Sequence, residues 1–137
     1  MVNGRNPIVA HEYLGDSVEG KTVFIADDII ASGESMLEVA SNLKARGAKR
    51  IIADATFPLF TSGLDKFDKA VEEGTLDYVV GTNLTYRKPE LLNRDWYVDV
   101  DVSKYAAYFI VALNHDMSVS SIIDPIKKIE ALLASRK

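Results

Sequence analysis

The sequence predicts an α/β fold in which helices flank a mostly parallel sheet. Three short apolar runs, residues 22–26, 50–56 and 77–80, are rich in Val and Ile, which is typical of parallel strands buried on both faces. Helical stretches separate these runs along the chain. Because parallel strands that follow one another need crossover connections, this order indicates a layered sheet with helices packed against it.

The two helices expected between these strands carry apolar side chains at helical spacing, and each ends at a glycine that suits a left-handed cap. The second helix also begins just after a glycine. The first apolar stripe comprises Met36, Leu37, Val39, Ala40 and Leu43, before Gly47; the second comprises Leu64, Phe67, Ala70 and Val71, between Gly63 and Gly74.

The carboxyl-terminal part adds a shorter strand and two more helices. The strand is expected near residues 96–100, and a helix over residues 103–114 follows it, with Ser103 as its N-cap. A last helix is expected over residues 125–135, because Pro125 suits a first turn and apolar residues recur along one side.

Residues 1–21 are expected to form a lead-in arm, in which the segment 8–13 is either a strand or part of the arm. A doubly wound sheet usually has strands on both sides of its first phosphate-binding strand, and almost nothing precedes residue 22. The domain is therefore expected to be truncated at its amino terminus. Because no repeat or low-complexity run divides the chain, residues 1–137 are expected to form a single domain.

The composition argues against several classes of protein. The chain of 137 residues has 47% hydrophobic content and no cysteine, and no secretion signal is recognisable, so we expect a cytoplasmic protein with one core. Its apolar runs are far shorter than the roughly 20 residues of a membrane-spanning helix. The net charge of −4, with scattered basic residues, argues against nucleic-acid binding but leaves a compact anion site open.

Residues 23–36 join a buried strand, two acids, a small-residue turn and the start of a helix. Ligands of open α/β sheets bind beyond the carboxyl ends of strands, where unpaired amides at the start of a helix point outward. A phosphate is expected against this turn, which offers little bulk, a flexible glycine and hydroxyl donors. The predicted phosphate-binding residues are Ala31, Ser32, Gly33, Glu34 and Ser35.

Asp27 and Asp28 lie a few residues before the turn. Their carboxylates can accept hydrogen bonds from the two hydroxyls of a ribose whose 5-phosphate occupies the turn. Ribose 5-phosphate therefore suits this spacing better than free phosphate or sulfate. The alternative interpretation is a pair of acids that caps a sheet edge beside a polar turn.

The run at residues 23–36 resembles the phosphoribosyl-binding motif of the type I phosphoribosyltransferase fold: four apolar residues, two acids, two apolar residues, a variable residue, Thr or Ser, Gly, a variable residue, and Ser or Thr. Ala31 stands where many members carry an acid. Further segments resemble the carboxyl-terminal half of ribose-phosphate pyrophosphokinases, although Phe57-Pro58 stands where His-Gly is common. These segments are Gly81-Thr82-Asn83, Asp101-Val102-Ser103-Lys104 and Ser118-Val119-Ser120.

The resemblance implies a transferase of nucleotide biosynthesis that moves pyrophosphate from ATP to ribose 5-phosphate, with magnesium, and releases AMP and phosphoribosyl pyrophosphate. It implies that Asp27 and Asp28 hold the ribose hydroxyls and share a magnesium ion, and that the enzyme is a homo-oligomer. ATP would be held mainly by the amino-terminal half of a two-domain synthetase. No catalytic residue is therefore expected within this chain, which is expected to be inactive alone.

Two other functions stay open. A purine or pyrimidine phosphoribosyltransferase would use the same pocket, although Ala31 and the Asp-Val-Ser-Lys and Ser-Val-Ser segments count against it. A non-catalytic regulatory module that binds full-length synthetase subunits is the second alternative.

Overall fold

The computed structural model describes residues 15–135, and the chain divides into two compact units, Met1–Val100 and Asp101–Lys137. The single domain expected over residues 1–137 therefore stays a prediction. The segment 8–13, expected to be a strand or part of an arm, lies outside the described residues.

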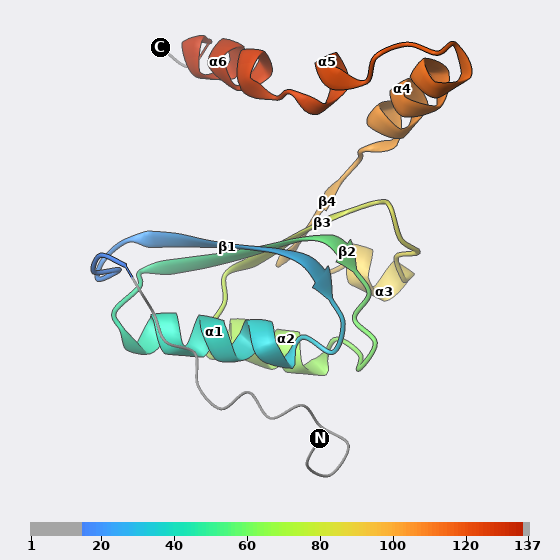
Figure 1. The fold of residues 1–137 in the computed structure, drawn as a ribbon. Coiled ribbons are helices and arrows are strands. Elements are labelled where there is room, and N and C mark those ends of the chain that lie inside the picture. The colour runs from blue at the N-terminus through green and yellow to red at the C-terminus, as the bar shows by residue number, and fades with distance from the viewer. Residues whose placement is uncertain (1–14, 136–137) are drawn as a thin grey trace, which may run out of the picture. The chain divides into compact units, whose positions relative to one another are not determined.

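A four-stranded parallel sheet forms the centre of the first unit (Figure 1). Its strands lie in chain order, β1 (Thr22–Ile30), β2 (Arg50–Pro58), β3 (Tyr78–Thr82) and β4 (Tyr97–Val100), and each neighbouring pair is parallel. The α/β fold with a parallel sheet, and the four strands themselves, are therefore confirmed.

Two helices make the crossover connections of this sheet. Helix α1 (Glu34–Ala45) connects β1 to β2, and α2 (Asp65–Glu72) connects β2 to β3. Figure 1 shows both helices on the same face of the sheet, as expected when strands in chain order are joined by crossovers of one hand. A four-residue helix that the sequence did not predict, α3 (Pro89–Leu92), lies between β3 and β4, with its proline in the first turn.

The expectation that the strands are buried on both faces is wrong for the first unit taken by itself. On β2, Ile51, Ala53 and Ala55 are fully buried, and the side chains between them are only partly buried. On the same face as those intervening side chains, Phe24 of β1 is 59% exposed and Tyr78 of β3 is 39% exposed. The reason is that α1 and α2 lie on one face, so burial alternates along β2 and β3.

Aromatic rings form the core beside α2. The ring of Phe67 is fully buried and lies 4.9 Å from the ring of Phe60 and 5.8 Å from that of Trp96, between centroids. Next to it, the Asp68 carboxylate accepts hydrogen bonds from Nε and Nη2 of Arg94, both at 2.9 Å, and from Nε1 of Trp96 at 2.8 Å. These bonds tie α2 to the segment that leads into β4.

The glycines that end the first two helices have the backbone conformation that the sequence predicts. Gly47 and Gly74 follow α1 and α2 with φ angles of 88° and 70°. Because this region of φ is unfavourable for residues with a Cβ atom, glycine suits both positions.

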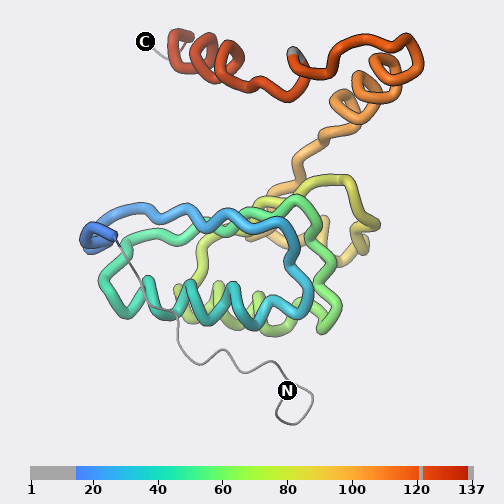
Figure 2. Tube along the Cα trace, viewed as in Figure 1, coloured from blue at the N-terminus to red at the C-terminus, as the bar shows by residue number. Residues whose placement is uncertain are grey.

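The second unit contains α4 (Ser103–Asn114), α5 (Ser120–Ile123) and α6 (Ile126–Ala134), which the Cα trace follows in Figure 2. Helices α4 and α6 confirm the sequence prediction, and α5 was not predicted. Ser103 is not the N-cap, because it is already the first residue of α4. Val102 occupies the cap position, and Oδ1 of Asp101 accepts a hydrogen bond from the Ser103 amide at 2.8 Å.

The helices of the second unit expose much apolar surface. Ala112 is the buried residue of α4, and Ile129 and Leu132 of α6 are at least half exposed. Within residues 15–135, no helix combines the length and the apolar character needed to cross a membrane.

Candidate functional site

A cavity of about 120 Å³ lies where β1 passes into α1. The predicted phosphate-binding turn forms most of its wall, together with one of the two acids. The lining residues are Asp27, Ile29, Ile30, Ala31, Ser32, Gly33, Glu34, Ser35 and Met36. The fold therefore brings the five predicted turn residues and Asp27 around one space.

The two acids lie inside β1 and not after it, because the strand continues to Ile30. Asp27 pairs with Ala55 of β2 and lines the cavity, whereas Asp28 is not among the lining residues. This difference is expected, since consecutive side chains of a strand point to opposite faces. Both acids are exposed, and Oδ1 of Asp27 accepts a hydrogen bond from the Asp28 amide at 2.8 Å. A ligand that contacts both carboxylates must reach around β1, which is an edge strand among the described residues.

Gly33 is required at the turn for two independent reasons. Its φ angle is 81°, in the left-handed region, and it occupies the N-cap position of α1. A Cβ atom at this position would also lie 2.3 Å from Cε2 and 2.4 Å from Cζ of the buried Phe67 ring. The turn is thus pressed against the aromatic core, which leaves its other side open to the cavity.

The start of α1 supplies hydrogen-bond donors to this cavity. The first amides of a helix have no partner within it, and the helix dipole favours an anion beside them. The first helical bond runs from the Leu37 amide to the Gly33 carbonyl at 3.0 Å. At the same turn, the hydroxyl of Ser32 accepts a long hydrogen bond of 3.4 Å from the Glu34 amide.

A cation from α2 also reaches this turn. Nζ of Lys66 donates a hydrogen bond to Oε1 of Glu34 at 2.6 Å, in a pair whose side chains are about half exposed. No sequence pattern singles out Lys66, because it lies 32 positions after Glu34. Its ammonium group balances the one carboxylate within the predicted phosphate-binding turn.

The loop between β2 and α2 holds the turn in place through main-chain hydrogen bonds. The amides of Leu59 and Phe60 donate to the Ile30 carbonyl at 2.9 and 3.2 Å, and the Thr61 amide donates to the Ala31 carbonyl at 2.9 Å. The turn is therefore preorganised by its neighbour, which reduces the ordering cost of binding a ligand there.

The loop after β3 is tied to the end of β2. The Thr82 hydroxyl donates a hydrogen bond to the Thr56 carbonyl at 2.6 Å and accepts one from the Leu84 amide at 3.2 Å. The Gly81-Thr82-Asn83 segment thus has a structural role at the same edge of the sheet as the turn, since the carboxyl ends of parallel strands lie together.

The sequence resemblance implies that a magnesium ion binds at the two acids. Among residues 15–135, no group of three or more His, Cys, Asp or Glu side chains is arranged to hold a metal ion. Asp27 and Asp28 offer carboxylate oxygens, and magnesium in phosphate-binding sites is commonly held by one or two carboxylates, with phosphate oxygens and water as the other ligands. Because the two side chains point to opposite faces of β1, Asp27 is the acid placed at the cavity for such an ion, and the residues described do not form a complete site by themselves.

Comparison with known proteins places this geometry in a family. Residues 5–124 match the phosphoribosyl synthetase-associated domain. A ribose-phosphate pyrophosphokinase from Shewanella oneidensis is 29% identical over 109 residues, which cover 80% of this chain and 33% of the relative. An orotate phosphoribosyltransferase from Oceanobacillus iheyensis is 41% identical over 64 residues, which cover 47% of this chain and 30% of the relative.

A solved structure confirms the fold. The crystal structure of phosphoribosylpyrophosphate synthetase from Mycobacterium smegmatis superposes with a TM-score of 0.64 at 24% identity, over 74% of this chain and 33% of that chain. The chain thus spans about a third of the length of the relatives that it matches. The family match covers most of the chain, including the strand, turn and helix described above. The chain therefore belongs to the phosphoribosyl synthetase-associated domain family.

Proposed function

We propose that this chain supplies the ribose-5-phosphate site of a ribose-phosphate pyrophosphokinase, which converts ATP and ribose 5-phosphate to AMP and phosphoribosyl pyrophosphate. The observation that carries the proposal is the cavity that Asp27 and residues 31–36 form where β1 meets α1. Similarity to curated ribose-phosphate pyrophosphokinases over four fifths of the chain supports the choice of substrate.

Each part of the cavity has a role in this proposal. The 5-phosphate lies against the amides at the start of α1, beside Ser32 and Ser35, where the helix dipole favours its charge. The hydroxyls of the ribose donate hydrogen bonds to Asp27, which lines the cavity, and to Asp28 at the edge of β1. Catalysis then depends on positioning this acceptor against ATP, which is bound by a part of the enzyme outside this chain.

Magnesium bound with the substrates would neutralise the charge of the transferring phosphates, and Asp27 and Asp28 are the residues of this chain that would hold it. The proposal includes a cytoplasmic enzyme whose subunits form a homo-oligomer. Size-exclusion chromatography with light scattering measures that oligomeric state directly.

A comparison of two ligands tests the site. Titration with ribose 5-phosphate and with inorganic phosphate, followed by phosphorus NMR, is expected to show binding of both at the turn. Asp27→Asn and Asp28→Asn should each weaken ribose 5-phosphate by roughly tenfold, because a lost hydrogen bond to a charged group costs about 1.5–3 kcal/mol. Phosphate, which does not use the acids, should lose much less affinity.

Asp95→Asn serves as the control, because Asp95 is exposed and lies outside the cavity. If the two acid variants weaken both ligands equally, the acids do not hold the sugar. If no ligand reaches residues 31–36, the proposed function fails at its first step.

A phosphoribosyltransferase is the second candidate, favoured by the similarity to an orotate phosphoribosyltransferase over almost half of the chain. That enzyme class would bind phosphoribosyl pyrophosphate in the same cavity. Ala31 argues against it, since many transferases of this fold carry an acid at the matching position. Incubation with phosphoribosyl pyrophosphate and orotate, and detection of pyrophosphate, separates the two candidates.

A non-catalytic module that binds a synthetase would instead co-purify with intact synthetase subunits without turning over either substrate.

A further inference from the structure

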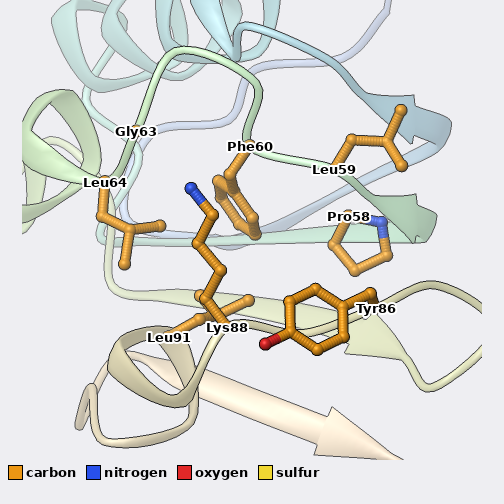
Figure 3. Close-up of a pocket in the computed structure, with 8 residues that line it drawn as sticks. All are labelled: Pro58, Leu59, Phe60, Gly63, Leu64, Tyr86, Lys88 and Leu91. Carbon is orange, nitrogen blue, oxygen red and sulfur yellow. The ribbon is translucent and has the colours of Figure 1, made fainter.

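A second cavity, separate from the phosphate turn, lies between the β2–α2 loop and the β3–α3 connection (Figure 3). Its free volume is about 90 Å³. The walls come from three places along the chain: the end of β2 with the following loop, the segment before α3, and α3 itself. The lining residues are Pro58, Leu59, Phe60, Gly63, Leu64, Tyr86, Lys88 and Leu91.

The walls of this cavity are mainly apolar and partly exposed. Phe60, Leu64 and Leu91 are buried and form a firm base, whereas the Tyr86 side chain is 82% exposed and Leu59 is 44% exposed. Covering such exposed apolar surface is favourable, and small-molecule sites typically combine apolar walls with a few polar groups. The cavity therefore suits a ligand with an apolar body.

Two polar groups stand at this cavity. Figure 3 shows the side chain of Lys88 extending between Leu64 and Phe60, so that its ammonium group points away from the hydroxyl of Tyr86, which lies beside Leu91. The ammonium group of Lys88 forms no ion pair with residues 15–135, and the Tyr86 hydroxyl forms no hydrogen bond with them. The ammonium group of Lys88 is thus available to bind an anionic group of a ligand.

Four of the main-chain amides at this cavity already donate hydrogen bonds within the chain. The amides of Leu59 and Phe60 donate to the Ile30 carbonyl, the Gly63 amide to the Phe60 carbonyl and the Leu91 amide to the Lys88 carbonyl. These amides cannot also cradle a phosphate in the way that the start of α1 can. The volume is also well below the roughly 300–1,000 Å³ typical of ligand pockets, so this cavity suits a ligand much smaller than a nucleotide.

We propose that this cavity binds a small monocarboxylic acid with a single ring or a short branched chain as its body. The body packs on Phe60, Leu64 and Leu91, and the carboxylate accepts a hydrogen bond from Nζ of Lys88. A single negative charge matches the single ammonium group at the cavity. The proposal is independent of ribose 5-phosphate binding, because no residue lines both this cavity and the one at the turn.

Benzoate and isovalerate are the probes, and benzamide is the uncharged analogue of benzoate. Amide chemical shifts of the whole chain are followed during titration, with saturable changes expected at Gly63, Leu64, Tyr86 and Leu91. Dissociation constants on the order of 1 mM are expected, as a ligand of so few atoms gives. Benzoate should bind at least about tenfold more tightly than benzamide, because only its carboxylate uses the charge of Lys88.

Lys88→Met keeps the length of the side chain and removes its charge, so it should abolish the preference for benzoate over benzamide. Lys69→Met is the matched control, since Lys69 is an exposed lysine that lines neither this cavity nor the turn. Thermal unfolding confirms that both variants fold. The proposal is overturned if benzoate and benzamide bind equally to the native chain, if Lys88→Met leaves the preference intact, or if the shifts are confined to residues 31–36.

Discussion

Gly33 shows how one residue can decide both the shape of the site and the stability of the core. Its left-handed backbone turns the chain from β1 into α1, and its missing side chain allows the Phe67 ring to lie directly beneath the turn. The shape of the cavity and the packing of the aromatic core therefore depend on the same glycine.

Gly33→Ala is expected to destabilise the first unit strongly. A left-handed residue with a Cβ atom costs about 1–2 kcal/mol, and forcing an extra methyl group into a packed core costs about 1–3 kcal/mol. We therefore expect a loss of roughly 2–5 kcal/mol in the free energy of unfolding, measured by urea denaturation. Gly74→Ala is the control, because Gly74 has a φ of 70° and a methyl group there would meet no atom within 4 Å, so it should lose only the backbone cost. Equal losses for the two variants would show that the Phe67 ring moves aside without lowering the free energy of unfolding.

At the scale of elements, two neighbouring residues hold α2 in place. Phe67 packs beneath the turn, and the neighbouring Asp68 binds Arg94 and Trp96 in the segment before β4. Burial raises the pKa of the Asp68 carboxyl, but the hydrogen bonds from Arg94 and Trp96 and the charge of Arg94 outweigh it, so that the pKa is lowered below its usual value.

The sign of this shift predicts a pH dependence. A carboxyl with a lowered pKa in the folded state contributes stability above its unfolded pKa of about 3.9, and that contribution is lost as the pH falls through the folded pKa. Asp68→Asn should therefore lower the midpoint of thermal unfolding near pH 7 by about 3–5 °C, the effect of roughly 1 kcal/mol in a domain of this size. The difference from the native chain should shrink below about pH 4. Asp95→Asn, at an exposed position, should show neither effect. If the unfolding midpoints of Asp68→Asn and the native chain differ by the same amount at all pH values, the Asp68 charge does not have this role.

At the scale of the whole molecule, the chain spans about a third of the synthetases that it resembles. We expect this chain alone to bind ribose 5-phosphate without converting it. A coupled assay of AMP release from ATP, ribose 5-phosphate and magnesium should give only the background rate, because phosphoryl transfer depends on groups that clamp the nucleotide. Turnover within the usual enzymatic range of about 1–10³ s⁻¹ would show that the active site is complete within these residues.

Much of the fold could be predicted because local sequence patterns indicate where most strands and helices lie. Three apolar runs located β1, β2 and β3, helical stripes located α1, α2 and α6, and the glycines at 47 and 74 located two helix ends. The positions expected for β4 and α4 are also confirmed. The helices α3 and α5 were missed because each has four residues, too few for a periodic pattern. The predicted N-cap at Ser103 is one position too late, since Val102 holds the cap position and Asp101 accepts the hydrogen bond from further upstream.

The sequence by itself determined the class of the fold and the identity of the turn, because residues 23–36 are contiguous and their spacing carries the motif. Only the tertiary structure decided which acid lines the cavity, since that depends on how far β1 continues and which face each side chain takes. The same holds for the pair of Lys66 with Glu34, the Phe67 ring beneath Gly33 and the cavity beside Lys88. Each of these joins residues far apart in the chain, and such contacts arise from the packing of helices on the sheet, which no local pattern encodes.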